Sequence, residues 1–262
     1  MVRRYAELSP EELDAALRDR PLAILPIGAL EWHGPHLPLG LDGIVAEWFC
    51  AQLAERTSGV LLPCLWTPIT TLPHEYSLDF SSEHMSPLFL QHFAQLARAG
   101  FRGICCVSGH YAQGHVVCLY QAALDAMSES PELAVLVGAP LDLLGDDSLL
   151  DHAARWETAQ LLAIRPDLVH TEQLPDDLSP RRAAILGEDP RLGTAPEGFD
   201  VLEKSLVLWS REAKKLLDPA HRAELVALTQ TRMSGYAEYE RRFKPAGATW
   251  EEAIQSWWTL KP

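Results

Sequence analysis

The segment that most constrains the fold is the apolar run LAILPIGA at residues 22–29. Polar and apolar positions do not alternate along it, so it predicts a strand that is buried on both faces. Strands of this kind occur in mostly parallel sheets that are covered by helices on both sides. The run therefore favours an α/β fold.

The other segments alternate between helical and extended patterns. Ser9 and Glu12 form a predicted capping box for a helix that continues to Arg18. Further helices are predicted at residues 42–58, 83–99, 152–164 and 219–243. Another helix is predicted to follow the polar residues after 107 and to end at about 128. Strands are predicted at residues 60–66, 103–107 and 134–138. This order predicts a three-layer α/β/α architecture with a mostly parallel sheet, in a single domain over residues 1–262.

Two regions near the C-terminus are harder to interpret. Residues 170–203 are rich in Pro, Asp and Arg, and we interpret them as either an extended flap or a contact between subunits. Asp218 is expected to cap the helix that begins after it, and Thr249 with Glu252 to cap a short last helix.

The charge balance limits the classes of partner. Lys and Arg number 22 against 36 Asp and Glu, which gives a net charge of −14. Such a surface repels phosphate backbones and anionic lipids, so neither nucleic acid nor a membrane is an expected partner. The five cysteines contain no Cys-x-x-Cys pair, which is typical of reduced core residues. The N-terminus lacks the apolar core of a signal peptide, and we expect a cytoplasmic protein.

Two of the predicted strands are followed by dense clusters of polar residues. EWHGPHLPLGLDG contains Glu31, His33 and Asp42, and SGHYAQGH contains His110. The carboxyl ends of parallel strands meet at one edge of the sheet, so these side chains are expected to converge. Two imidazoles and two carboxylates suit a divalent metal such as Zn, Mn or Fe(II). Asp42 is the central candidate for a carboxylate that bridges two ions about 3.5–4 Å apart.

A simpler interpretation stays open at this point. His33 and His36 lie in a loop rich in Gly and Pro, where an imidazole often does no more than satisfy backbone groups. Spacing alone does not separate a metal site from this alternative.

Four segments, in the same order, resemble the creatininase (creatinine amidohydrolase) family. LPIGALEWHGPHLPLGLD is similar to the family's strand-to-loop motif, GFRGICCVSGHYAQ to the segment with its Gly-His pair, and HAARWETAQLLAIRPDLV to its His-Ala-Gly-x-x-Glu-Thr-Ser helix. LPHEYSLDFS resembles its Phe-Pro-Gly-Thr-x-Ser-Leu substrate loop and retains Ser77 and Leu78. Together these matches cover residues 22–169.

The resemblance implies two divalent ions per chain, of Zn, Mn or Fe. Carried over to this sequence, Glu31, Asp42 and His110 hold one ion, and His33 with the bridging Asp42 holds the other.

The remaining ligand of the second ion departs from the family pattern. Creatininases have Glu two positions after the Gly-His histidine, where this chain has Ala112. The resemblance then points to Glu157 as this ligand and as a catalytic residue. The alternative is that Glu157 is only a carboxylate on the surface of a helix.

For the reaction, the resemblance implies hydrolysis of a non-peptide C–N bond in a small cyclic amide or a related amide, by a hydroxide that bridges the two ions. We expect His152, at the start of the predicted helix, to protonate the leaving nitrogen, ahead of His36. His36 has a second interpretation, in which it orients the loop or a metal ligand. Tyr111 is expected to line the substrate pocket or to stabilise the oxyanion, and the alternative is that its ring only packs against its neighbours.

Specificity is expected to depend on the substrate loop. Ser77 is retained from the family pattern, whereas His74 and Glu75 stand where the family has Gly and Thr. These replacements add bulk and charge to the pocket wall, so the resemblance leaves the small-molecule substrate open.

Other functions stay open beside the amidohydrolase. The same site suits hydrolysis of a formamide, a peptide or a cyclic ketone, because each reaction begins with attack on a carbonyl group. A non-catalytic ligand-binding protein is the alternative from another class; Ala112 favours it and Glu157 opposes it. The resemblance also suggests a homo-oligomer, in particular a homohexamer.

Overall fold

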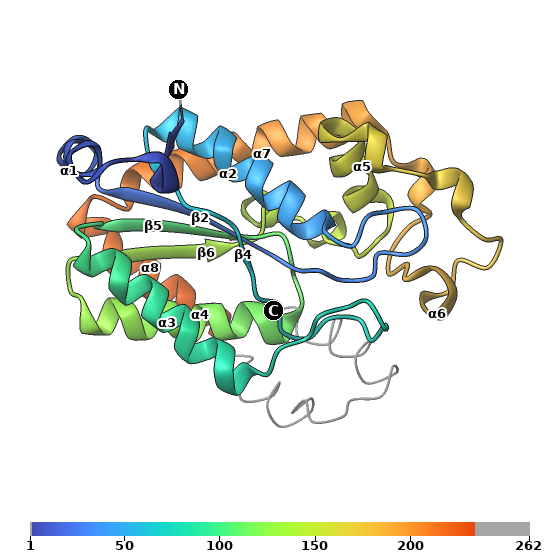
Figure 1. Ribbon diagram of the computed structural model, residues 1–262, viewed down its shortest axis with the longest axis horizontal. Coiled ribbons are helices and arrows are strands. Elements are labelled where there is room, and N and C mark those ends of the chain that lie inside the picture. Colours follow the sequence, from blue (N-terminus) through green and yellow to red (C-terminus); the bar gives the residue numbers. More distant parts are fainter. Residues whose placement is uncertain (1, 234–262) are drawn as a thin grey trace.

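The computed structural model describes residues 2–233, which form a six-stranded sheet with helices on both faces (Figure 1). The strands are β1 (Arg3–Arg4), β2 (Leu22–Gly28), β3 (Val60–Leu61), β4 (Leu65–Trp66), β5 (Gly103–Ser108) and β6 (Ala134–Gly138). Their order is β1-β3-β2-β5-β6, β4 pairs with the end of β2, and all of these pairs are parallel. Every residue of β2 is buried, which confirms that the apolar run is a strand covered on both faces.

Helices form the outer two layers. The longer ones are α1 (Pro10–Asp19), α2 (Leu41–Thr57), α3 (Ser82–Arg98), α4 (Gln113–Glu129), α5 (Arg155–Ile164), α7 (Ala195–Lys215) and α8 (Pro219–Met233). The short ones are η1 (Tyr5–Glu7), η2 (Asp142–Leu144), η3 (Asp147–Leu149), η4 (Pro166–Leu168), η5 (Thr171–Gln173), α6 (Pro180–Ala183) and η6 (Pro190–Leu192). α2 and α7 cover one face of the sheet, α3 and α4 cover the other, and α8 packs against α4 (Figure 1). The predicted three-layer α/β/α architecture is therefore confirmed.

Aromatic and aliphatic side chains pack against both faces of the sheet. On the α2 and α7 side, Phe49 packs edge-on against Trp209, with ring centroids 6.2 Å apart. On the α3 side, Phe89 and Phe93 are almost fully buried. The five cysteines are free thiols, and only Cys64 among them is partly exposed, as expected for reduced core residues.

Local signals predicted the helix starts well. The capping box of α1 is present: Ser9 accepts from the backbone N–H of Glu12, and the Glu12 carboxylate accepts from the backbone N–H of Ser9. The Asp218 carboxylate accepts from the backbone N–H of Ala220 at the start of α8. The expected continuation of this helix to residue 243, and the cap by Thr249 and Glu252, lie outside the described residues.

Two predicted elements have different limits in the structure. The strand expected at residues 60–66 is divided into β3 and β4, with Pro63 between them, which has no N–H for a sheet hydrogen bond. The helix expected at residues 152–164 begins only at Arg155. His152 pairs with Leu186 in an antiparallel bridge, and Ala153 has a positive φ of 51°, which a right-handed helix does not accommodate.

Parts of residues 170–203 pack against α5 and the loop before it. Leu174, Ala183 and Ile185 form a small buried cluster with Ala154. The last part of the segment begins α7, a helix that the sequence patterns did not predict. Thr194 caps it by accepting from the backbone N–H of Glu197. No helix among the described residues is long and apolar enough to cross a membrane.

Close backbone contacts bring the start of α2 against the ends of two strands. A Cβ atom on Gly28, in β2, would lie 2.3 Å from the Cα of Gly43 in α2. A Cβ atom on Gly109, after β5, would lie 2.0 Å from the carbonyl oxygen of Asp42. Glycine is therefore required at both strand ends, because only glycine lets the first turn of α2 carry Asp42 to the carboxyl edge of the sheet.

Candidate metal centre

Five buried side chains from separate segments meet at the carboxyl edge of the sheet. Glu31 and His33 lie in the loop after β2, Asp42 in the first turn of α2, His110 after β5, and Glu157 in the first turn of α5. None of them is more than 3% exposed. The structure thus brings together all five residues that the sequence offered as metal ligands.

Asp42 lies at the centre of this group. Its Oδ1 is 3.0 Å from Nε2 of His33, and its Oδ2 is 3.3 Å from Nδ1 of His110. The two oxygens of one carboxylate therefore face two different imidazoles, which is the arrangement that a bridging carboxylate requires.

The other two carboxylates complete a cluster on each side of Asp42. Oε2 of Glu31 is 2.9 Å from Nδ1 of His110, and Oε2 of Glu157 is 3.6 Å from Nε2 of His33. The result is one group of Glu31, Asp42 and His110 and another of His33, Asp42 and Glu157, each with its donor atoms within 4.8 Å of one another. Glu157 is 3% exposed, so it is not the helix-surface carboxylate of the alternative interpretation.

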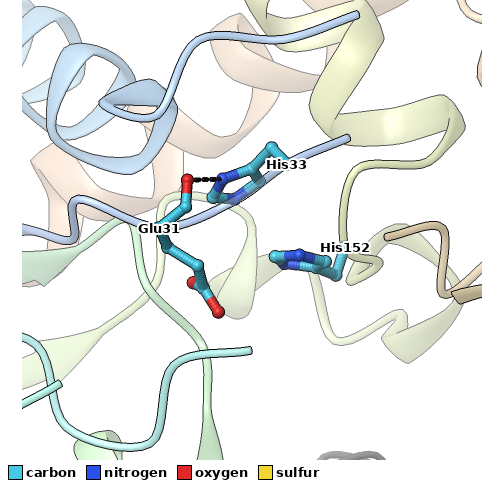
Figure 2. A group of neighbouring side chains, drawn as sticks. All are labelled: Glu31, His33 and His152. Atoms are coloured by element: carbon cyan, nitrogen blue, oxygen red, sulfur yellow. Dashed lines mark hydrogen bonds between the residues drawn. The ribbon is translucent and has the colours of Figure 1, made fainter. Parts of the chain in front are cut away.

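His152 joins the centre from another loop, where it forms a third group with Glu31 and His33 (Figure 2). Its ring centroid is 4.3 Å from that of His33, and its Nε2 is 3.2 Å from the carbonyl oxygen of Trp32. The prediction that His152 starts a helix was wrong, because the bridge to Leu186 holds it in extended backbone ahead of α5. The same bridge turns its ring toward the cluster.

Backbone groups orient the ligand side chains. Nδ1 of His33 is 3.0 Å from the carbonyl oxygen of Glu31 (Figure 2), and Nε2 of His110 is 3.0 Å from the carbonyl oxygen of Ile69. Each carbonyl accepts a hydrogen bond from one ring N–H, so the other nitrogen, which faces Asp42, carries the lone pair in the neutral ring. The backbone N–H of Leu72 donates to Oε1 of Glu31, which leaves Oε2 directed at the centre.

The charges of the metal-free centre compensate one another. Burial alone would lower the pKa of His33, but Asp42 and Glu157 raise it to about 10, and Glu31 and Asp42 likewise raise the pKa of His110. Burial opposes the ionisation of Glu31 and Asp42, yet the facing imidazoles hold both carboxyl pKa values below their usual range. The pKa of Glu157 is raised, because burial and the nearby carboxylates outweigh His33. Metal ions would therefore replace protons at this centre.

The donor set fits a divalent metal. Atoms bound to one ion at about 2.0–2.2 Å in a tetrahedral site lie on the order of 3.5 Å from each other, and the four contacts between an imidazole and a carboxylate in this cluster range from 2.9 to 3.6 Å. Oε2 of Glu31, Nε2 of His33 and both oxygens of Asp42 are buried, and they face one another or the ring of His110 at 2.9–3.3 Å. A divalent metal ion could bind these atoms in place of the protons that now hold the imidazoles and carboxylates together.

Asp151 supports the site, and the sequence analysis did not identify it. Its two carboxylate oxygens accept from the backbone N–H groups of Trp156 and Glu157, at 2.7 and 3.0 Å. In return, Oε2 of Glu157 accepts from the backbone N–H of Ala153 at 2.6 Å. These reciprocal hydrogen bonds enclose His152 and fix the first turn of α5, while burial raises the pKa of Asp151 to about 7.

The loop that resembles the family's substrate loop lies beside the candidate metal ligands. Oγ of Ser77 accepts from the backbone N–H of Trp32 at 3.0 Å, so Ser77 fixes the loop to the segment between Glu31 and His33. His74 stacks on Trp32, with ring centroids 4.6 Å apart. Glu75 is exposed and belongs to none of the three clusters among the described residues.

Tyr111 and His36 flank the centre. Tyr111 follows His110 directly, and burial with the charge of Glu157 raises the pKa of its phenol, which therefore stays protonated. His36 is fully buried, with Nε2 3.4 Å from Oγ1 of Thr158 in α5. The residue that His36 faces follows Glu157 directly in α5. His36 itself belongs to none of the three ligand clusters.

The fold and the buried cluster define an α/β protein with a candidate metal centre at the carboxyl edge of a parallel sheet. Residues 6–215 match the family described as creatinine amidohydrolase, and the chain belongs to this creatininase family. The family resemblance of the four sequence segments is thus confirmed.

Curated relatives have more than one activity in their names. A creatinine amidohydrolase of Pseudomonas putida is 25% identical over 178 residues, which are 58% of this chain and 68% of that protein. A mycofactocin precursor peptide peptidase of Mycolicibacterium smegmatis is 30% identical over 206 residues, which are 68% of this chain and 78% of that protein. Because one relative is named for a peptide, the family gives no support for restricting the chain to non-peptide bonds.

Solved structures agree with the fold. A crystal structure of creatinine amidohydrolase has a TM-score of 0.72 at 20% identity and covers 83% of this chain and 99% of its own. Two other creatininase structures, with TM-scores of 0.70, are described as a mutant of Zn-Zn type and as an Mn form. At this identity the comparison confirms the mostly parallel α/β fold alone.

Proposed function

We propose that the chain is a metal-dependent hydrolase that cleaves the C–N bond of an amide at a binuclear centre. The observation that carries the proposal is Asp42, whose two oxygens face two separate groups of buried donors. Glu31, Asp42 and His110 would hold one ion, and His33, Asp42 and Glu157 the other. Zn or Mn suits these ligands, and Fe is the third candidate.

When bound, the two ions would supply an activated water molecule between them and polarise the carbonyl group of the substrate. The residues of this chain would provide the remaining functions. Tyr111 keeps its phenolic proton, so it can donate a hydrogen bond to an oxyanion beside His110. The buried ligand shell excludes bulk water, which strengthens these electrostatic interactions.

His152 is the candidate for moving the proton. Its Nε2 donates to the carbonyl oxygen of Trp32, and burial with the charge at His33 lowers its pKa to about 4, so the ring is neutral near pH 7. A metal ion bound to His33 would also place a positive charge beside His152. His152 would therefore first accept a proton at Nδ1 from the attacking water molecule and then deliver it to the leaving nitrogen as the C–N bond breaks.

The scissile bond is proposed as an amide C–N bond, including that of a peptide. A small-molecule amide, cyclic or linear, and a short peptide both present the carbonyl and the leaving nitrogen that this arrangement addresses. Formamides and cyclic ketones remain substrates to be compared, since they share the first step, attack on a carbonyl group.

A non-catalytic ligand-binding protein is the second candidate. Ala112 favours it, because this position carries no carboxylate. Glu157 opposes it, because a buried carboxylate directed at His33 has no evident use in a protein without the second ion.

We also propose that the chain forms a homo-oligomer. A hexamer is the specific expectation, and light scattering would test it.

Metal analysis followed by a hydrolysis screen tests the proposal. We expect close to two transition-metal equivalents per chain and turnover of at least one class among cyclic amides, linear amides and short peptides. Absence of metal even after reconstitution would refute the metal centre. Two bound equivalents with no turnover of any amide, formamide, peptide or ketone would favour the ligand-binding protein.

A further inference from the structure

Three aromatic side chains lie in successive ring contacts beside the candidate metal centre. Trp32 and His74 are parallel to within 16°, with ring centroids 4.6 Å apart. The ring of Tyr76 follows, 5.3 Å from that of His74 and inclined by 58°. We call Trp32, His74 and Tyr76 the aromatic platform.

The outer end of the platform is open to solvent. The side chain of Tyr76 is 60% exposed, and Leu78 and Phe80 on the same loop are 45% and 39% exposed. Leu39, whose carbonyl oxygen accepts from the backbone N–H of Glu31, is 37% exposed. Half of the exposed large hydrophobic side chains of the described residues therefore belong to two neighbouring segments, which makes this part of the surface a candidate for binding.

Hydrogen bonds hold the backbone of the loop that carries the platform. The backbone N–H of Ser77 donates to the carbonyl oxygen of His74, and that of Tyr76 donates to Nδ1 of His74. Leu78 donates to the carbonyl oxygen of Leu30, and Ser77 accepts from the backbone N–H of Trp32. A ligand that stacks on a fixed surface loses less affinity to ordering of the protein.

The platform is continuous with the metal ligands. Trp32 lies between Glu31 and His33 in the sequence, and its carbonyl oxygen is 3.2 Å from Nε2 of His152. The same loop reaches Glu31 through the backbone N–H of Leu72. A substrate whose carbonyl group lies at the centre could thus extend a neighbouring group along the platform.

We propose that the aromatic platform binds a planar aromatic ring of the substrate, so that the substrate class is amides with an aromatic group near the scissile bond. Such a ring stacks on Tyr76 and His74, whereas a saturated ring of similar size gains only the burial of its surface. The exposed Glu75 carboxylate between these residues disfavours an anionic group at the same place. This inference rests on the proposed function for the position of the scissile bond.

Binding of matched ligands to the metal-loaded protein tests the proposal. The probes are N-acetyl-phenylalaninamide, N-acetyl-cyclohexylalaninamide and N-acetyl-alaninamide. Affinity is measured as Kd by calorimetry for an amide that chromatography shows to stay intact, and as Kd from its competitive inhibition or its KM for an amide that is hydrolysed. We expect the aromatic amide to bind about threefold to tenfold more tightly than the cyclohexyl amide, as aromatic stacking energies predict. N-acetyl-glycyl-glycyl-phenylalaninamide distinguishes the source of the ring: tighter binding than the single-residue amide indicates a peptide, and equal binding indicates a small aromatic amide.

Variants locate the preference on the platform. Tyr76→Ala and His74→Ala are expected to remove the preference for the aromatic ring, and Tyr76→Phe to keep it. Phe199→Ala is the matched control, because Phe199 is 51% exposed on α7, away from the loop. Equal binding of the aromatic and cyclohexyl amides, or a preference that survives both alanine variants, would overturn the platform.

Hydrolysis of N-acetyl-alaninamide separates this inference from the proposed function. Turnover of that amide without any aromatic preference in binding overturns the platform alone. An aromatic preference in binding without turnover of any amide overturns the proposed hydrolase and leaves the platform as a ligand-binding surface.

Discussion

Replacing Glu157 by Gln should remove one metal ion and leave the other. Glu157 faces His33 across 3.6 Å and takes no part in the group of Glu31, Asp42 and His110. Zinc binding of about 10–16 kcal/mol, shared among four ligands, gives roughly 3 kcal/mol for each ligand, or more than a hundredfold in affinity. The second ion is therefore expected to be lost at concentrations that saturate the first.

The change should also be visible in thermal stability. An ion present at a hundred times its Kd stabilises the folded state by about 2.7 kcal/mol, and a site weakened a hundredfold gives only about 0.4 kcal/mol at the same concentration. For a chain of this size the difference corresponds to about 5–9 °C in Tm. The metal-loaded Glu157→Gln variant should melt lower than the metal-loaded parent by this amount.

Without metal, the order of stability should reverse. Burial and nearby carboxylates raise the pKa of Glu157, so the folded protein holds this proton more tightly than the unfolded chain. A carboxyl group with a raised pKa costs stability as the pH rises above its unfolded value, because the unfolded chain ionises first. Gln avoids this cost and keeps an oxygen for the backbone N–H of Ala153. The metal-free variant should therefore equal the parent near pH 4 and exceed it near pH 7.

The assay compares metal content by mass spectrometry with Tm in chelator and in excess metal. Glu188→Gln is the control, because Glu188 is an exposed carboxylate that pairs with Arg155 at the start of α5. We expect the control to keep both equivalents and the stability order of the parent. A Glu157→Gln protein that retains two equivalents and the full metal-dependent rise in Tm would refute Glu157 as a ligand.

Three further predictions test the same centre. Asp42→Asn should lose both ions, because its two oxygens face both groups; more than one equivalent by metal analysis would contradict the bridge. Metal binding at pH 7 should release protons and tighten as the pH rises, because the raised pKa values of His33 and His110 keep both rings protonated beforehand; calorimetry in buffers of different ionisation enthalpy would refute this by finding no release. Asp151→Ala should cost about 2–4 kcal/mol by urea unfolding, since it strips two backbone N–H groups of their acceptor, whereas unchanged stability would remove Asp151 from its supporting role.

The parts of the fold that were predicted depend on local chemistry. The capping box of α1 works over three residues, and the burial of β2 follows from its own composition. The metal-ligand candidates were found for a related reason, since the carboxyl ends of parallel strands lie together in any such sheet. The predicted strand before Glu31, His33 and Asp42 was sufficient to place them at that edge.

The parts that were missed depend on contacts between distant segments. His152 was expected in a helix, but its pairing with Leu186 holds it outside, and nothing in the local sequence announces a partner 34 residues away. Asp151 accepts from N–H groups five and six residues later, an offset that differs from the usual capping box. The start of α7 was within reach, because Thr194 and Glu197 have capping-box spacing, but the Pro-rich and Asp-rich segment before it obscured the signal.

The loop at residues 69–80 connects the proposed recognition surface with the candidate metal centre. Its first part contacts two candidate ligands, through the carbonyl oxygen of Ile69 at His110 and the backbone N–H of Leu72 at Glu31. Its second part carries two rings of the aromatic platform, and Asp79 ties the two parts together by accepting from the backbone N–H of Thr70. A substitution in this loop therefore acts on both properties, since any shift of its backbone turns a ligand side chain as well as a platform ring. A substitution can change specificity without disturbing the candidate metal centre only if it leaves the backbone hydrogen bonds of the loop intact. The exposed ring of Tyr76 is such a position.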